Sequence, residues 1–371
     1  MSAISPIEDI IEDARNGKPF VLVDAEDREN EGDIVIPAQF ATPERIAHMA
    51  THARGLICLS ITAQRAAYLQ LPPMSLNNRS GHGTAFTVSI EAREGVTTGI
   101  SAFDRARTIA VATNPSFGPE DIVTPGHVFP LVARDGGVLI RAGHTEAAVD
   151  ISRLAGLMPA GVICEIMNDD GTMARLPDLI PFAQRHGMKI GTIADLIAHR
   201  RRSEKLVEKV ADAPFETHYG EGFTIHVYRD LVDGAEHVAL SRGRIHPDGE
   251  TLVRVHQVDL TADLLGYSHA HHNYVPAMLQ QIAAHDGPAV AVFVRDPDPQ
   301  SISQRVKGGR KAYSNQFGPR DYGIGAQILR ELGVARMNLL TSSSGKMSAL
   351  AGFGLEIVRR TPIIDTNGEN A

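Results

Sequence analysis

An acidic segment at residues 24–33 is the part of the chain best suited to chemistry. Six of its ten side chains are carboxylates, and Arg28 lies among them. Carboxylates crowded in this way repel one another unless protons or a cation neutralise them. A hard divalent metal ion with oxygen ligands relieves that repulsion most directly, so the segment predicts a metal site. A solvated acidic turn without a ligand is the alternative.

Residues 141–145, with the sequence RAGHT, form a second candidate site. We expect them to join a strand at 138–140 to a helix capped by Thr145. Such a junction presents backbone N–H groups and the positive end of a helix dipole, which suit a phosphate group. Arg141 can add a bidentate contact. His144, taken alone, is better explained as a satisfied, half-buried side chain.

The acidic segment lies between two apolar runs, at 20–23 and 34–36, that are typical of buried strands. It is therefore expected to be a loop joining two strand ends, where side chains can converge on a ligand. Further predicted elements are strands at 56–61, 85–91, 138–140 and 161–167 and helices at 42–54, 177–186 and 194–201. Short strands and helices without strict alternation predict an α+β fold with layers around a mixed sheet.

Composition limits the classes of protein that the chain can be. Its 371 residues are enough for two domains, and 43% hydrophobic with 22% charged residues is typical of a soluble globular protein. The net charge of −8 argues against nucleic-acid and membrane-surface partners, so an anionic substrate would need local arginines or a metal. The two cysteines, Cys58 and Cys164, fit a reducing cytoplasm. No secretory signal is apparent, and no apolar run approaches the ~18 residues of a membrane span.

Several long motifs occur in one order over the N-terminal half of the chain. They are DRENEGD at 27–33, GVTTG at 95–99, PGHVFP at 125–130, RAGHTEA at 141–147, CE at 164–165 and NDDGTMA at 168–174. Together they resemble the 3,4-dihydroxy-2-butanone 4-phosphate synthase family. These enzymes make the four-carbon precursor of riboflavin from ribulose 5-phosphate. We place the synthase domain at residues 1–203.

The resemblance implies roles for particular residues. Glu29 and His144 would be the two protein ligands of a magnesium or manganese ion, which leaves open positions for substrate hydroxyls and water. His127 and Glu165 would be essential for catalysis. Substrate contacts are implied for Arg28, Glu29, Asp33, Arg141, Ala142, Gly143, His144, Thr145 and Glu165. A homodimer with active sites near its interface is implied as well.

The implied reaction is that of a lyase. D-ribulose 5-phosphate is enolised beside its ketone and loses water, its carbon skeleton rearranges, and its fourth carbon leaves as formate. Enolisation needs a base, and the leaving hydroxyl needs an acid. The chain supplies the candidates Glu29, Glu31, Asp33, Glu165 and His127. The sequence leaves open which of them moves which proton.

From about residue 214 the chain resembles GTP cyclohydrolase II, an enzyme often fused to this synthase. The resemblance rests on RVH at 254–256, RDYGIGAQIL at 320–329, LGV at 332–334 and LLT at 339–341. We expect an α/β domain at 214–371, with the boundary near 203–213.

This second domain departs from its family where the chemistry resides. The family holds a catalytic zinc with three cysteines, and residues 214–371 contain none. The three positions become Asp259, Ala270 and His272. The family's proton-accepting aspartate falls on Gly318, and DPDP at 296–299 replaces its nucleotide loop. We therefore expect an inactive domain without zinc.

Two alternatives to a silent second domain stay open. One is a bifunctional enzyme that also acts on GTP through a substitute metal site, with the candidate ligands His256, Asp259, His269, His271 and His272. A zinc site needs at least three suitable ligands, and a polar histidine-rich loop explains these residues more simply. The other alternative is a regulatory or scaffolding domain that binds a nucleotide or a partner.

Overall fold

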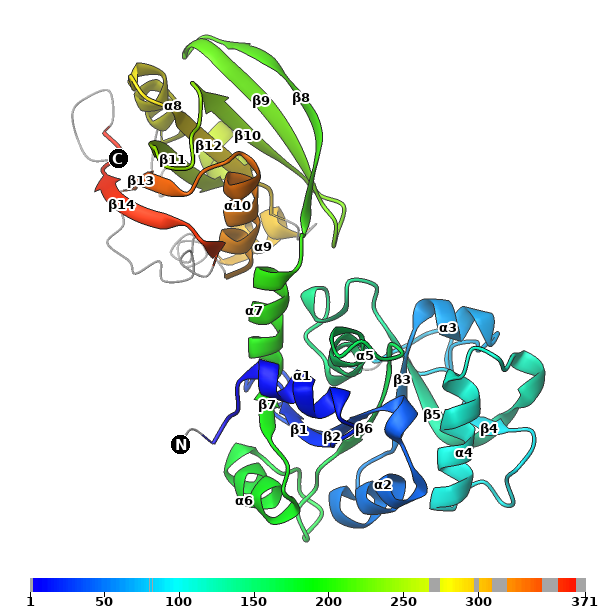
Figure 1. The fold of residues 1–371 in the computed structure, drawn as a ribbon. Coiled ribbons are helices and arrows are strands. Elements are labelled where there is room, and N and C mark those ends of the chain that lie inside the picture. The colour runs from blue at the N-terminus through cyan, green and yellow to red at the C-terminus, as the bar shows by residue number, and fades with distance from the viewer. Residues whose placement is uncertain are drawn as a thin grey trace. The chain divides into compact units, whose positions relative to one another are not determined.

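The chain divides into two compact units, Met1–Arg200 and Arg201–Ala371, and each contains one seven-stranded sheet (Figure 1). The computed structural model describes residues 3–79, 81, 83–266, 274–296, 300–308, 319–341 and 353–364. None of the helices in these ranges is both long and apolar enough to cross a membrane.

The first unit contains seven helices and seven strands among its described residues, with α7 crossing into the second unit. The helices are α1 (Ile7–Arg15), α2 (Pro43–His48), α3 (Ala63–Tyr68), α4 (Ala102–Thr113), α5 (His144–Leu154), α6 (Leu176–His186) and α7 (Ile193–Ser203). The strands are β1 (Phe20–Val23), β2 (Gly32–Pro37), β3 (Cys58–Thr62), β4 (Ile90–Ala92), β5 (Ile122–Ala133), β6 (Ala160–Glu165) and β7 (Ile190–Thr192). Short helical turns are η1 (Ala38–Phe40), η2 (Met49–Ala53), η3 (Pro119–Asp121) and η4 (Gly137–Leu139).

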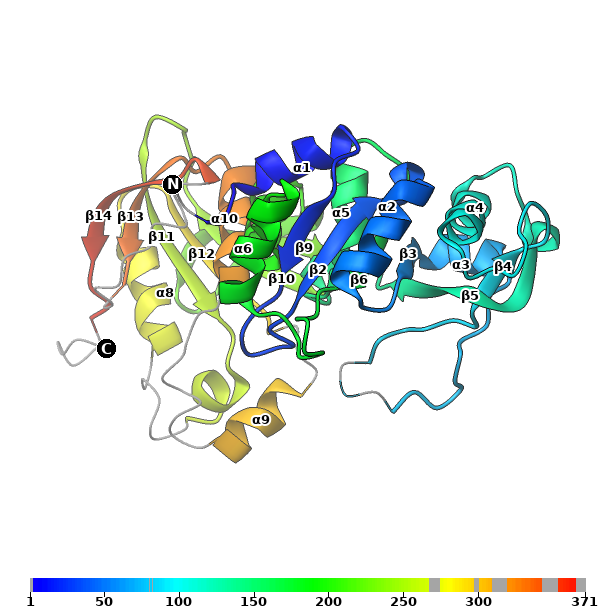
Figure 2. The ribbon, with the colours of Figure 1, turned by 90° about the horizontal axis from the view of Figure 1, so that it is seen from below.

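The sheet of the first unit has the strand order β4-β5-β3-β6-β2-β1-β7. β1 pairs with β7 and β3 with β5 in parallel, whereas the other neighbours are antiparallel. The helices α1 and α5 lie on one face of the sheet, and α2, α4 and α6 lie on the other (Figures 1 and 2). Their apolar side chains pack on these two faces. The predicted α+β architecture around a mixed sheet is thereby confirmed.

The strands expected on either side of the acidic segment are confirmed as β1 and β2, which pair with each other. The strand predicted at 138–140 is wrong, because Gly137–Leu139 forms the 3-10 turn η4. Gly136 and Gly137 have φ values of 86° and 62°, which bend the chain. The backbone N–H of Val138 donates to the Asp150 carboxylate (2.8 Å) instead of to a neighbouring strand.

Two further local predictions are wrong. The strand expected at 85–91 is reduced to β4 and isolated bridges at Phe86 and Thr87. Thr145 does not cap a helix, because α5 begins at His144 with Gly143 in the N-cap position. A β-branched residue with a hydroxyl suits a cap locally, but the chain reaches its helical conformation one residue before Thr145.

The second unit has the strand order β14-β13-β11-β12-β10-β9-β8. β11 to β14 pair in parallel, and β8 to β10 form an antiparallel extension, so this sheet is also mixed. Its strands are β8 (Val207–Thr217), β9 (Gly220–Asp230), β10 (Glu236–Arg242), β11 (Glu250–Gln257), β12 (Ala289–Val294), β13 (Arg336–Leu340) and β14 (Glu356–Thr361). Its helices are α8 (Tyr274–Ala284), α9 (Ser301–Gly308) and α10 (Pro319–Glu331), with the π-helical turn η5 (Leu260–Leu264).

The stretch 203–213, where we placed the boundary, contains the end of α7 and the first half of β8. The domain limits 1–203 and 214–371 stay predictions.

Candidate active site

A row of residues across the first sheet brings two acidic side chains together. Asp33 on β2 lies opposite Glu165 on β6, and on its other side it lies opposite Leu22 on β1. Residues in such a row point to the same face of a sheet. Leu22 packs on the face covered by α5. Asp33 and Glu165 therefore face the layer that contains His144, the first residue of α5.

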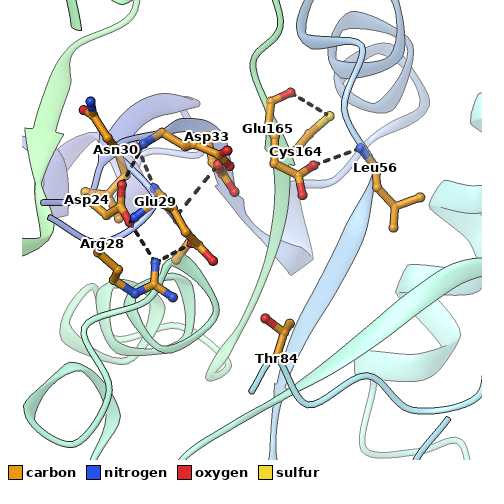
Figure 3. A network of polar contacts seen from close by, with 12 residues as sticks. Asp24, Arg28, Glu29, Asn30, Asp33, Leu56, Thr84, Cys164 and Glu165 are labelled. Atoms are coloured by element: carbon orange, nitrogen blue, oxygen red, sulfur yellow. Dashed lines mark hydrogen bonds and ion pairs between the residues drawn. The ribbon is translucent and has the colours of Figure 1, made fainter. Parts of the chain in front are cut away.

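The loop between β1 and β2 is organised around the buried carboxylate of Asp24 (Figure 3). This carboxylate accepts hydrogen bonds from the backbone N–H groups of Glu29 (3.1 Å) and Glu31 (2.8 Å). The Arg28 guanidinium donates to Asp24 (2.8 Å) and also contacts the Glu29 carboxylate. Burial alone would raise the pKa of Asp24, but the hydrogen bonds from Glu31, Arg28 and Glu29 hold it below its usual value. Asp24 is therefore a stable anion that shapes the loop.

Ligand atoms of Asp24, Glu29 and His144 all lie within 4.8 Å of one another, an arrangement that could hold a metal ion. His144 Nε2 donates to the Leu22 carbonyl oxygen (3.0 Å), so Nδ1 of the neutral ring keeps its lone pair. Burial lowers the pKa of His144 and favours that neutral form. Two carboxylates and a neutral imidazole fit a divalent cation.

Asp33 is the most strongly perturbed acid in this site. It is 2% exposed, and burial followed by repulsion from Glu165 and Glu31 raises its pKa well above the usual value. Among the described residues, its Oδ1 atom is buried without a hydrogen-bond partner and lies 3.8 Å from Nδ1 of His144. A buried carboxylate oxygen in this position needs a proton or a cation.

Glu165 and Glu31 also have raised pKa values, and burial is the main cause for both. Glu165 Oε2 accepts the backbone N–H of Leu56 (2.9 Å), which fixes its orientation (Figure 3). The cluster therefore contains carboxyl groups that hold protons more tightly than ordinary acids, as general acids and bases near neutral pH must.

His127 on β5 contacts Glu91, with Nδ1 2.7 Å from Oε2 of the carboxylate. Phe129 on β5 and Ile163 on β6 both lie opposite Cys58 on β3. His127 comes two residues before Phe129, and Glu165 comes two residues after Ile163. Both therefore lie beyond Cys58 at the same end of the strands. They stand two strands apart, on the order of 10 Å. The structure thus places His127 beside the carboxylate cluster rather than within it.

Glu91 is a site residue that the sequence analysis missed. Gly99 has a φ of 89°, and a Cβ atom there would lie 2.0 Å from Oε2 of Glu91. Asp104 holds this turn by accepting hydrogen bonds from the Gly99 N–H (3.0 Å) and the Thr97 hydroxyl (2.8 Å). The motif GVTTG therefore leaves room for the acid that orients His127. The sequence offered one signal for Glu91, because this glutamate directly follows the alternating apolar residues Phe86, Val88 and Ile90.

Residues 141–145 still place an arginine at a helix N-terminus, as a phosphate site requires, although the turn η4 precedes them instead of a strand. Arg141 Nη1 donates to the Glu146 carboxylate (2.7 Å), which is buried, and Nη2 donates to the Thr84 hydroxyl (3.3 Å). The guanidinium is thereby held at the N-terminus of α5, whose first N–H groups have no partner within the helix. Gly143 leaves room for the guanidinium in this position, because a Cβ atom would lie 2.3 Å from Arg141 Nη1.

Of the other residues in this segment, Thr145 is the second residue of α5 and is buried, whereas Ala142 is exposed. Asp24 lies inside the acidic segment at 24–33 and Glu146 inside the motif at 141–147, but sequence reasoning gave neither of them a role of its own. Thr84 was missed, and nothing in the sequence distinguished it.

The described candidate ligands of the second unit are engaged in other contacts. His256 Nε2 lies 2.8 Å from the Asp263 carboxylate. The Asp259 carboxylate accepts the N–H groups of Thr261 and Ala262 and so caps η5. The further positions named from the sequence, His269, Ala270, His271, His272, Gly318 and 297–299, lie outside the described residues.

A sheet edge rich in carboxylates, beside an arginine and a helix N-terminus, is typical of an α+β enzyme that acts on a phosphorylated substrate with a divalent metal. Residues 8–199 match the family model of 3,4-dihydroxy-2-butanone 4-phosphate synthase, and residues 208–362 match that of GTP cyclohydrolase II. The chain belongs to the 3,4-dihydroxy-2-butanone 4-phosphate synthase family, with a GTP cyclohydrolase II domain fused to the synthase domain.

Two relatives match almost the whole chain. The 3,4-dihydroxy-2-butanone 4-phosphate synthase of Neisseria meningitidis serogroup B is 50% identical over 360 residues, which covers 96% of this chain and 98% of the relative. The riboflavin biosynthesis protein RibBA of Aquifex aeolicus is 50% identical over 383 residues, 98% of this chain and 94% of the relative.

Solved structures agree with this assignment. A two-domain 3,4-dihydroxy-2-butanone 4-phosphate synthase from A. baumannii, RibBX, is 43% identical, has a TM-score of 0.78, and covers 96% of this chain and 99% of its own. A synthase in complex with two magnesium ions is 42% identical, has a TM-score of 0.53, and covers 54% of this chain and 98% of its own.

Proposed function

We propose that the first unit converts D-ribulose 5-phosphate to L-3,4-dihydroxy-2-butanone 4-phosphate and formate in riboflavin biosynthesis, as a lyase. The observation that carries this proposal is the pair Asp33 and Glu165, two perturbed acids on neighbouring strands beside Glu29 and His144. Family membership supports the same conclusion.

The metal would be held by the Glu29 carboxylate and Nδ1 of His144, with Asp24 orienting the loop. When bound, a magnesium or manganese ion would stabilise negative charge that develops on the substrate's oxygen atoms. The magnesium-bound relative supports a divalent metal at this family's site. The hydrogen bond from His144 Nε2 to Leu22 fixes the ring so that Nδ1 faces the acidic loop.

The chain's own groups would bind the substrate and move its protons. Arg141, held by Glu146, and the N-terminal N–H groups of α5 would bind the phosphate. Arg28 and Asp33 would contact the sugar hydroxyls. Asp33, Glu165 and Glu31 would exchange protons with the substrate as a coupled cluster, and His127 would be oriented by Glu91.

The test is incubation of the full chain with D-ribulose 5-phosphate and magnesium while formate is measured. We expect release of formate in the wild type and a loss of more than about 100-fold in Glu29→Gln and His144→Ala, since loss of an outer-shell partner alone costs roughly 10–100-fold. Glu26→Gln is the matched control, because Glu26 is an exposed carboxylate of the same loop. Full turnover by Glu29→Gln, or by the wild type in excess chelator, would contradict the metal assignment.

The second domain is proposed to be inactive on GTP and to bind no catalytic zinc. Residues 214–371 contain no cysteine, the Asp259 carboxylate caps η5, and His256 contacts Asp263. The relative from N. meningitidis carries the synthase name alone although it matches 96% of this chain. Incubation of the intact chain with GTP and zinc should yield neither formate nor pyrophosphate. Turnover that disappears in His272→Ala and Asp259→Ala would establish a substitute metal site instead.

A further inference from the structure

Three histidines from two helical segments meet on the face of the first sheet that α2 and α6 cover. His48 ends α2, His52 lies in the π-helical turn η2, and His186 ends α6. Their ring centroids are 4.6 Å (His48 to His52), 4.8 Å (His48 to His186) and 4.7 Å (His52 to His186) apart. One ring nitrogen of each lies within 4.8 Å of the others. In both views α2 and α6 lie side by side (Figures 1 and 2).

The cluster is unusual because a ring nitrogen of one of its histidines has no hydrogen-bond partner in the described part of the chain. Nε2 of His48 is buried and has no hydrogen-bond partner among the described residues. Burial and the neighbouring histidines lower the pKa values of His48 and His186, which favours neutral rings with a lone pair on one nitrogen. Phe182 packs against His186, with ring centroids 4.5 Å apart, and shields one side of the cluster. A buried imidazole nitrogen without a protein partner is a place where a water molecule or an ion is expected.

The backbone around the cluster also favours a cation. His186 is the last residue of α6, and His52 lies in the last turn before Arg54 closes η2 in the left-handed conformation. Carbonyl ends of helices carry partial negative charge, which stabilises a positive ion nearby. The exposed Arg45 and Arg185 oppose this effect, but solvent screens exposed charges. π-helical turns frequently occur at functional sites, and here η2 contains His52 and directly follows His48.

We propose that His48, His52 and His186 form a second metal site, separate from the synthase site, that binds a transition-metal ion of the zinc type. Three neutral imidazoles are suitable ligands for zinc, copper, nickel or cobalt, whereas magnesium prefers oxygen. A fourth position would be left to water. The ligand atoms, which lie within 4.8 Å of one another, need to approach by at most about 1.5 Å to reach zinc–nitrogen distances of about 2.0–2.1 Å, a change that side-chain rotation can supply.

The length of α6 separates His186 from the Glu29 loop of the synthase site. Arg175, directly before α6, donates to the backbone carbonyl of Glu29 (2.7 Å) and so marks the end of α6 near the acidic loop. His186 lies at the other end of this 11-residue helix, about 15 Å away at 1.5 Å per residue. A metal at His186 would join α2 and η2 to the far end of α6, and its effect would be to stabilise this layer of the fold.

The experiment uses the full chain, freed of metal with a chelator and titrated with zinc in a calorimeter and with cobalt in a spectrophotometer. All proteins carry Glu29→Gln, which disables the synthase site. We expect about one zinc ion to bind to the histidine cluster with a rise in Tm, and cobalt to give visible absorption typical of nitrogen ligands. The double variant His52→Ala/His186→Ala should bind zinc more than about 100-fold more weakly, because loss of outer-shell partners alone costs roughly 10–100-fold.

Two controls keep the proposal falsifiable. His271→Ala/His272→Ala removes histidines of the second domain and should leave the cobalt spectrum and the rise in Tm unchanged. The milder variant His186→Gln, with its Tm measured without metal, separates loss of a ligand from loss of the fold. The proposal is overturned if zinc does not bind, if His52→Ala/His186→Ala binds it as tightly as its parent, or if the loss follows His271 and His272.

Discussion

Asp33 is a buried acid and Glu165 is a half-buried acid on the neighbouring strand, and burial raises the pKa of each. A raised pKa means that the folded protein binds the proton more tightly than the unfolded chain does. The free energy of unfolding therefore falls as the pH rises from the usual carboxyl pKa to the raised one, and stays lower above it. At neutral pH and without metal, these residues reduce stability in return for reactivity.

Glu165→Gln tests this cost directly. The amide is isosteric, its oxygen can still accept the Leu56 N–H, and it carries no charge. In chelator we expect a higher Tm than the wild type at neutral pH, by about 2–4 °C per kcal/mol gained. The gain should shrink as the pH falls and should vanish below about pH 4, where the carboxyl is mostly protonated in both states. Formate release should fall by about 10²–10⁴-fold.

The matched control is Glu26→Gln, whose exposed carboxylate should give no pH-dependent gain in Tm. A Glu165→Gln protein no more stable than the wild type at pH 7 would show that burial of this acid has no energetic cost.

At the scale of elements, the N-terminus of α5 lies next to both the acidic loop and Arg141. His144 faces the acidic loop, and Gly143 and Glu146 together fix Arg141. The helix packs its apolar face, including Ala147 and Ile151, on the sheet, so its first turn is held rigidly against the row that contains Asp33. The proposed metal site and the proposed phosphate site are therefore positioned by the same helical turn.

Gly143→Ala should displace Arg141 without unfolding the protein. The new Cβ would lie 2.3 Å from Arg141 Nη1, the end of a flexible side chain that can move away. Loss of a charge-assisted contact worth about 1.5–3 kcal/mol should lower kcat/KM by roughly 10–150-fold, mainly through KM. Arg141→Ala should lower it by a similar factor, and the two changes should not add.

Gly249→Ala is the control, since its Cβ would meet only ordinary contacts of 3.4 Å or more. Unchanged kinetics of Gly143→Ala at sub-saturating substrate would place the phosphate elsewhere.

At the scale of the whole molecule, a buried ion pair holds α7 against the rest of the first unit. Arg200 Nη1 donates to the Asp150 carboxylate (2.7 Å) and to the Gly136 carbonyl oxygen (2.8 Å), and both charged side chains are 5% exposed. An independent synthase unit must therefore end after α7. The homodimer expected from the family resemblance stays a prediction that sedimentation analysis can test.

Two truncated chains test the independence of the synthase unit. A chain ending at Ser203 keeps Arg200 and should release formate at a rate within a few-fold of the full chain. A chain ending at Thr192 leaves Asp150 buried without Arg200 and also removes the buried side chains of Ile193 and Leu196, so it should lose at least about 3–5 kcal/mol of stability. Thermal unfolding and formate release measure both. Loss of activity in the longer piece, although folded, would show that residues after 203 contribute to catalysis.

The sequence by itself determined the elements whose patterns are local. Apolar runs at 20–23 and 34–36 predicted β1 and β2, and the acids between them predicted the loop that contains Glu29. Burial of every residue in both strands agrees with that pattern. The motifs carried the family resemblance because their chemistry depends on residues that are close along the chain.

Only the tertiary structure decided which distant residues meet. Sheet order and register, which depend on pairing between remote segments, place Glu165 opposite Asp33 and Glu91 against His127. The turn at 137–139 forms because Asp150, on a later helix, accepts the N–H that a strand would have used. The meeting of His186 with His48 likewise has no local signal, because it arises from two helices that pack on the same face of the sheet.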